Sequence, residues 1–289
     1  MRYIDSTIYA SRRSAPELEQ MALAGITGVI EPMAPQGYVR RHAESFFEDA
    51  ERLLENDAQR VNRYGIGYGV CIGLPAYEAS NFVLCQQILE HMGKLLQHER
   101  VVALGEIGLA YLSNAEETLF RHQLQLAKQH QLPVVVALPT HNRREVAART
   151  ITVLQEENFA PSAVLVNGVT EETWAYVRDY GAWIGLTLDA QTHLSLERAK
   201  QLIEHGQLQG VLINSAAGRL MGDPLAVARF ARYLHLNGYT KNQIEEMVYH
   251  NPKWFYSQRR ALPLMDYQQT QTNQTVYRHP TMAGAGAQY

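Results

Sequence analysis

The sequence has few of the features that mark secreted, disulfide-rich or membrane-spanning proteins. Only two cysteines, Cys71 and Cys85, occur among 289 residues. Two are too few for a disulfide framework, and both lie in apolar contexts that suit a reducing compartment. No run approaches the roughly 18 apolar residues of a membrane span, and the first residues contain no apolar signal-peptide core. We therefore expect a soluble, cytoplasmic protein.

Lysine is also scarce, with five lysines against 21 arginines. The formal net charge is −3 and no basic block occurs, so the sequence shows no nucleic-acid-binding patch. The five lysines all fall in segments expected to be helical, at positions 94, 128, 200, 241 and 253. This placement disfavours a Schiff-base aldolase and a metal bridge through a carbamylated lysine. Glycine loops of the usual phosphate-binding form are absent as well.

What the sequence does contain is a regular alternation of apolar runs and amphipathic segments. Hydrophobic residues make up 46% and charged residues 19% of the chain, enough for a large core. Eight apolar runs, each followed by a helical segment, predict strands at 2–6, 26–31, 66–74, 101–106, 132–138, 163–167, 182–188 and 210–214. Such alternation indicates a parallel sheet with right-handed crossovers. Eight units over about 250 residues predict an α/β fold, a (β/α)8 TIM barrel.

Domain limits and helix ends can also be predicted. We expect a single barrel domain over residues 1–260 and a flexible C-terminal tail over 261–289, because the last residues are rich in Gln, Thr, Asn, Gly and Ala. Helix starts are expected at Asn114, with Glu117 as its capping partner, at Thr170, at Asp223 and at Thr240.

The carboxyl ends of all eight strands face one mouth of such a barrel, where catalytic groups gather. The stretch 101–111 is central, because Gly105 and Gly108 flank Glu106 and let the backbone pass close to a pocket. We take Glu106, His141 and Asp189 as candidate catalytic residues. The candidate pocket-lining residues are Asp5, Thr7, Tyr9, Glu31, Asn167, His193, Asn214 and Ser215. Cys71 lies within a strand and is expected to be a packing residue.

The barrel pattern with Gly-Glu-Ile-Gly at 105–108 resembles the TatD-like metal-dependent hydrolases of the amidohydrolase superfamily. The resemblance covers residues 1–258 and includes Ile4-Asp5, Glu31-Pro32, Leu-Pro-Val at 132–134 and His-Asn-Pro at 250–252. The chain is most similar to the branch found in gene clusters with a prenyltransferase-like partner, in which strand eight also ends in Asn-Ser-Ala-Ala, as 214–217 do here.

The resemblance implies two divalent metal ions held by a His-x-His after strand one, the strand-four glutamate, histidines after strands five and six, and an aspartate after strand eight. Glu106 alone matches. The other positions hold Thr7 and Tyr9, Ala137 or Leu138, Asn167-Gly168, and Gly218. One glutamate cannot replace a shell of four to six donors. We therefore expect no metal ligands besides Glu106 and no cofactor.

Three hypotheses follow from this pattern. The first is a barrel that kept the fold, lost metal-dependent hydrolysis and binds a small molecule or a protein partner. The second is an enzyme with a rebuilt site that uses Glu106 with His141, Asp189 or His193. The third is a still-active hydrolase of phosphoester or other ester or amide bonds that uses zinc, manganese or magnesium through ligands aligned differently. The plainest interpretation of His141 and His193 is that they are solvated loop residues.

The acids expected at the mouth bear on this choice. Asp5, Glu31, Glu106 and Asp189 would repel one another without a cation, so some of their pKa values should be raised. A bound cationic ligand would relieve that repulsion, as would nearby arginines.

Overall fold

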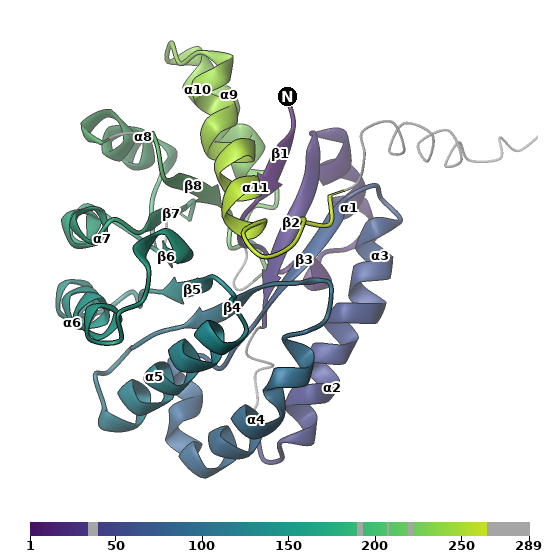
Figure 1. Ribbon diagram of the computed structural model, residues 1–289. Helices are drawn as coiled ribbons and strands as arrows, with labels where there is room; N and C mark the ends of the chain where they lie inside the picture. The colour runs from purple at the N-terminus through teal and green to yellow at the C-terminus, as the bar shows by residue number, and fades with distance from the viewer. Residues whose placement is uncertain (34–39, 190–192, 207, 219–221, 265–289) are drawn as a thin grey trace, which may run out of the picture.

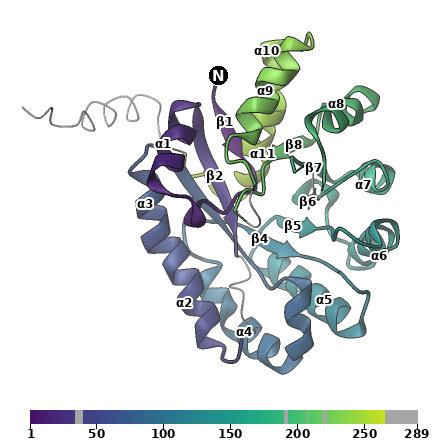
Figure 2. The ribbon, with the colours of Figure 1, turned by 180° about the vertical axis from the view of Figure 1, so that it is seen from behind.

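Eight parallel strands curve into a nearly closed barrel with helices outside it, a (β/α)8 TIM barrel, as Figures 1 and 2 show from opposite sides. The computed structural model describes residues 1–33, 40–189, 193–206, 208–218 and 222–264. The strands pair in sequence order, and their bounds are β1 (Tyr3–Asp5), β2 (Ile26–Pro32), β3 (Gly67–Ile72), β4 (Val101–Ile107), β5 (Val134–Ala137), β6 (Val164–Asn167), β7 (Trp183–Thr187) and β8 (Val211–Asn214). All eight strands predicted from the sequence are confirmed.

The helices follow the strands in turn. Their bounds are α1 (Ala15–Leu23), α2 (Glu44–Arg52), α3 (Ala58–Asn62), α4 (Phe82–Leu95), α5 (Asn114–Gln129), α6 (Arg143–Glu156), α7 (Trp174–Tyr180), α8 (Leu196–His205), α9 (Ala226–Leu236), α10 (Lys241–Glu245) and α11 (Asn251–Tyr256). A π-helical turn, Leu53–Asp57, joins α2 to α3, and a second, Glu246–His250, joins α10 to α11. No helix in the described part of the chain is long and apolar enough to cross a membrane.

Three of the predicted helix starts need correction. The N-cap of α5 is Ser113 rather than Asn114, because the Ser113 hydroxyl accepts the backbone N–H of Glu116. Thr170 lies in a turn that precedes α7, which begins at Trp174. Asp223 likewise precedes α9 and accepts the backbone N–H of Leu225 in a turn. Asp223 thus bonds its own local backbone before the helix begins, a common alternative to capping, whereas the Thr170 hydroxyl has no hydrogen-bond partner in the described structure.

Thr240 caps α10 as predicted. Its hydroxyl accepts the backbone N–H of Gln243, whose side chain bonds the Thr240 N–H in return. This reciprocal pair satisfies two backbone donors that the first helical turn cannot satisfy.

The barrel interior is a separate apolar cluster inside the ring of strands. One residue in two along each strand points inward, and the cluster includes Ile4, Ile30, Cys71, Val102, Val135, Leu165 and Leu212. Helix α11 closes the amino-terminal end by adding Phe255 and Tyr256 to this cluster. Figure 1 shows α11 lying against β1 and β8. The Tyr256 hydroxyl donates to the Ser6 carbonyl across 2.8 Å.

The chain after α11 packs along the same end of the barrel. Arg259 and Arg260 donate to backbone carbonyls that follow α4. Leu262 is 8% exposed and joins the interior cluster, with Leu264 packed against it. The packed barrel therefore extends to Leu264, four residues beyond the predicted limit. The remainder of the predicted tail, 265–289, lies outside the described residues.

Candidate functional site at the barrel mouth

Five side chains at the carboxyl ends of the strands form one hydrogen-bonded set, which we call the mouth network: Thr7, Tyr9, Glu106, Asn167 and Asn214. Asn167 is its centre, because its amide nitrogen donates to Glu106 Oε1 at 3.0 Å and to Thr7 Oγ1 at 2.8 Å. Asn214 Nδ2 donates to Asn167 Oδ1 at 3.3 Å. The Tyr9 hydroxyl donates to Glu106 Oε2 at 3.4 Å. The network thus ties the chain after β1 to β4, β6 and β8.

Strand alternation explains why these residues meet. Leu165 and Leu212 belong to the interior cluster, so Asn167 and Asn214, two residues further along, also face inward. Gly185 on β7 leaves the space for the Asn167 side chain, because a Cβ at residue 185 would lie 2.1 Å from Asn167 Oδ1. All five residues of the network are at most 9% exposed.

Two buried groups, the Cys71 thiol and the Tyr256 phenol, feel the charge of Glu106. Cys71 and Tyr256 lie in the interior cluster. Burial, with the Glu106 charge as a second cause, raises the pKa of the Cys71 thiol well above its ordinary value. The thiol therefore stays protonated, which agrees with the packing role expected from the sequence. Burial likewise raises the pKa of Tyr256.

Glu31 does not join the mouth network. Ile30 faces the interior, so Glu31 points to the helix side of β2. Its carboxylate accepts the Ser11 backbone N–H at 2.8 Å and the Tyr68 hydroxyl at 2.8 Å, and it also bonds the Ser11 hydroxyl. Arg60 supports the same loop by donating to the carbonyls of Ala10, Ser11 and Arg13. Burial raises the Glu31 pKa to about 7.

Asp5, at the end of β1, is held by Ser215, which directly follows β8. Its carboxylate accepts the Ser215 hydroxyl at 2.6 Å and the Ser215 backbone N–H at 3.1 Å. Backbone bonds from Ala216 to Thr7 and from Tyr9 to Ala217 extend this junction. Burial raises the Asp5 pKa to about 7. The sequence predicted raised carboxyl pKa values, and the structure assigns them to Asp5 and Glu31, with burial as the larger cause and repulsion between acids as a lesser one.

The candidate histidines lie at the rim. His141 is exposed, its Nε2 lies 3.2 Å from the Ala110 carbonyl oxygen, and its ring stacks on Tyr111 with centroids 4.8 Å apart. The structure therefore does not bring His141 into the hydrogen-bonded set of Glu106. Asp189 is half-buried after β7, and its carbonyl accepts the His193 backbone N–H. The His193 imidazole lies beside Gly168.

The residues present do not fit a two-metal centre. Among the described residues, no group of three or more His, Cys, Asp or Glu side chains is placed to hold a metal ion. The internal segments outside the description, 34–39, 190–192, 207 and 219–221, contain none of these four residue types. Asn167 and Tyr9 also direct hydrogens, rather than lone pairs, at Glu106.

Gly218, at the position where the resemblance implies an aspartate, has no room for a ligand side chain. Its φ is +105°, and a Cβ there would lie 2.9 Å from both the Cβ and the carbonyl oxygen of Tyr9. A side chain would therefore be strained and would collide with the loop that carries Tyr9.

Sequence analysis missed the partners of the buried acids. Ser11, Tyr68 and Arg60 hold the loop beside Glu31, and Tyr256 reaches Ser6 from the opposite end of the chain. Strand parity could have predicted that Glu31 faces the helices, because Ile30 and Glu31 are neighbours on one strand. No sequence signal identifies the long-range contacts of Ser11 or Tyr256.

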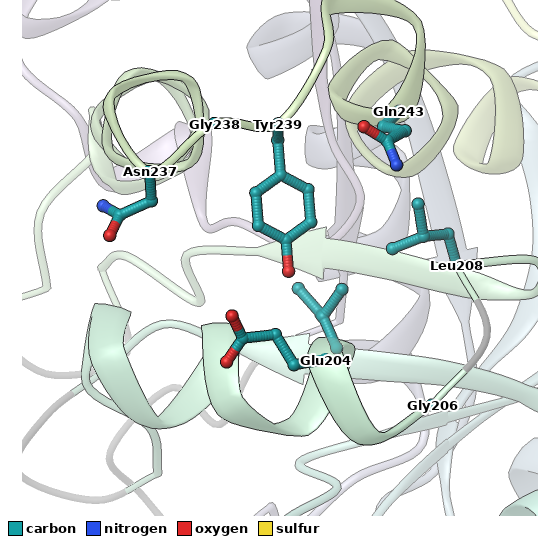
Figure 3. Close-up of a pocket in the computed structure, with 8 residues that line it drawn as sticks. Glu204, Gly206, Leu208, Asn237, Gly238, Tyr239 and Gln243 are labelled. Carbon is teal, nitrogen blue, oxygen red and sulfur yellow. The ribbon is translucent and has the colours of Figure 1, made fainter.

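A surface groove of about 360 Å³ lies at the opposite end of the barrel, between α8 and α10. Leu208, which precedes β8, lines it, and Figure 3 shows the Tyr239 hydroxyl pointing toward the Glu204 carboxylate. The Glu204 carboxylate is paired with Lys200 at 2.7 Å. This groove is separate from the mouth network.

Comparisons with known proteins agree with the architecture. The family model for TatD-related DNases matches residues 7–257. An uncharacterised metal-dependent hydrolase of Methanocaldococcus jannaschii is 30% identical over 254 residues, which cover 88% of this chain and 99% of that protein.

Solved structures show the same fold at lower identity. The TatD-like protein from Archaeoglobus fulgidus has a TM-score of 0.71 at 22% identity, with 88% of this chain and 99% of that chain covered. The phosphotriesterase homology protein from Escherichia coli, complexed with phosphate in its active site, has a TM-score of 0.64 at 14% identity, covering 89% and 99% of the two chains. This chain therefore belongs to the TatD-related DNase family.

Proposed function

We propose that this protein is a TatD-family barrel that has lost metal-dependent hydrolysis and acts as a non-hydrolytic binding protein. The observation that carries the proposal is the hydrogen bonding of Glu106. At the barrel mouth, its carboxylate accepts hydrogens from Asn167 and Tyr9, where a metal-ligating glutamate would direct its lone pairs at a cation.

The chemistry of the network supports this reading. A two-metal hydrolase needs cations that polarise the substrate and lower the pKa of a bound water. An amide and a phenol can hold a carboxylate in place, but they supply no such Lewis acid. The Asn167 amide hydrogens go to Glu106 and Thr7. The network therefore presents hydrogen-bond donors where a metal centre would need ligands with free lone pairs.

Among the described residues, neither His141 nor Cys71 offers a replacement for that chemistry. His141 bonds the Ala110 carbonyl at the rim, and Cys71 keeps its proton because burial raises its pKa. A metal-free hydrolase would need an activated nucleophile and a base within hydrogen-bond reach of each other. The relative from Methanocaldococcus jannaschii is named a metal-dependent hydrolase. Activity assays are therefore the first test of the proposal.

The test measures hydrolysis of bis(p-nitrophenyl) phosphate, a carboxylic ester and a single-stranded oligonucleotide, with manganese, magnesium or zinc added. We expect no rate above that of Glu106→Ala for any substrate or metal. A metal-dependent rate that disappears in Glu106→Ala would refute the proposal. Melting temperatures of both proteins show that each is folded in the assay.

A further inference from the structure

The mouth network contains more hydrogen-bond acceptors than donors. Asn167 spends both amide hydrogens on Thr7 and Glu106, and the Thr7 hydroxyl donates to the Ser6 carbonyl. Each oxygen of Glu106 accepts one bond, although a carboxylate can accept about four. The Asn214 Oδ1 atom has no hydrogen-bond partner in the described structure.

The orphaned oxygen belongs to the same hydrogen-bonded network as the Glu106 carboxylate. Asn214 and Glu106 bond to opposite ends of the same Asn167 amide, so both flank one side chain inside the barrel. Asn214 is fully buried. Burying a carbonyl oxygen without a donor is costly, which favours a ligand that brings hydrogens to this position.

Glu106 also lacks an ion-pair partner among the described residues. None of the ion pairs within residues 1–33, 40–189, 193–206, 208–218 and 222–264 includes Glu106. Burying a carboxylate without a cation is costly, and a cationic partner would offset that cost.

We propose that the mouth network binds the ammonium group of a small primary amine, which donates hydrogen bonds to Glu106 and to Asn214 Oδ1. An ammonium group supplies three donors, one positive charge and no acceptors, which matches what the network lacks. Water would bring as many acceptors as donors and no charge. This inference rests on the proposed function, because it places an amine where metal ions would otherwise lie.

The test titrates the full-length protein with methylammonium chloride at constant ionic strength and measures the melting temperature and the heat of binding. Tetramethylammonium chloride is the matched probe, because it carries the same charge without any N–H donor. Potassium chloride tests for an inorganic cation site. We expect saturable stabilisation by methylammonium alone. Equal stabilisation by either of the other two salts, or none by methylammonium, would overturn the inference.

Variants locate the site. Glu106→Gln removes the charge with little change in shape, and we expect methylammonium affinity to fall about tenfold or more. Glu204→Gln removes an acid from the groove of Figure 3 and should leave the affinity unchanged. If Glu106→Gln binds as well as the wild type, or Glu204→Gln alone loses binding, the site is wrong. Failure to bind amine while hydrolysis is also absent would overturn this inference and leave the proposed function standing.

Discussion

The side-chain amide of Asn167 donates to the carboxylate of Glu106 across 3.0 Å and so joins the ends of β6 and β4 inside the barrel. The same amide accepts from Asn214 and donates to Thr7. One side chain therefore links four of the eight strand ends. A neutral amide therefore holds these strand ends together.

Asn167→Ala should therefore destabilise the fold strongly. The change leaves Glu106 Oε1 and the Asn214 amide without these partners in a buried setting, so we expect the free energy of unfolding to fall by about 2–4 kcal/mol. Urea denaturation at neutral pH measures it. Asn237→Ala is the matched control, because Asn237 is exposed and its amide donates to the Tyr233 carbonyl at the surface. A loss for Asn167→Ala no larger than that of the control would contradict the bridging role.

Glu31 should make the protein less stable as the pH rises. Its folded-state pKa is about 7, raised from 4.5 chiefly by burial. The folded state therefore keeps the proton at pH values where the unfolded chain has lost it. The stability contribution is full below pH 4.5 and is lost as the pH rises to about 7, by on the order of 3 kcal/mol in the fully buried limit.

Glu31→Gln should remove this part of the pH dependence. Urea melts at pH 5 and pH 8 on wild type and variant isolate Glu31, because Asp5 and the histidines titrate in both proteins. We expect the variant to lose less stability than the wild type between the two pH values. The exposed Glu19→Gln serves as control and should follow the wild type. Parallel curves for Glu31→Gln and wild type would show that burial does not hold the proton on Glu31.

Leu262 should contribute to the stability of the barrel although it follows the last helix. It is 8% exposed and packs with the interior cluster, so Leu262→Ala should cost about 2 kcal/mol. Leu236→Ala, at a leucine that is 73% exposed, should change stability by less than about 0.5 kcal/mol. Thermal melts compare the two. Equal effects would mean that the segment after α11 does not seal the barrel.

The fold could be predicted from the sequence because it depends on local patterns. Each strand is an apolar run buried on both faces, and each crossover needs a helix, so the order of elements determines the barrel. The helix start at Ser113 was missed by one residue because Ser113 and Asn114 are both good caps, and the choice depends on the preceding loop.

The site was less predictable because its contacts are long-range. The sequence placed Thr7, Glu106 and Asn167 at the mouth, and strand alternation after Leu165 brings Asn167 to the interior. That Asn167 presents its amide hydrogens to Glu106 depends on the space left by Gly185 on the neighbouring strand. Glu31 was grouped with Glu106, although the alternation after Ile30 directs it to the helices.

The central claim is that the mouth network replaces the metal ions of the family. Elemental analysis tests it most directly, on protein incubated with zinc and manganese, freed of unbound metal by gel filtration and compared with Glu106→Ala. We predict well under one equivalent of metal per chain and no difference between the two proteins. About two equivalents bound to the wild type and lost in Glu106→Ala would contradict the account.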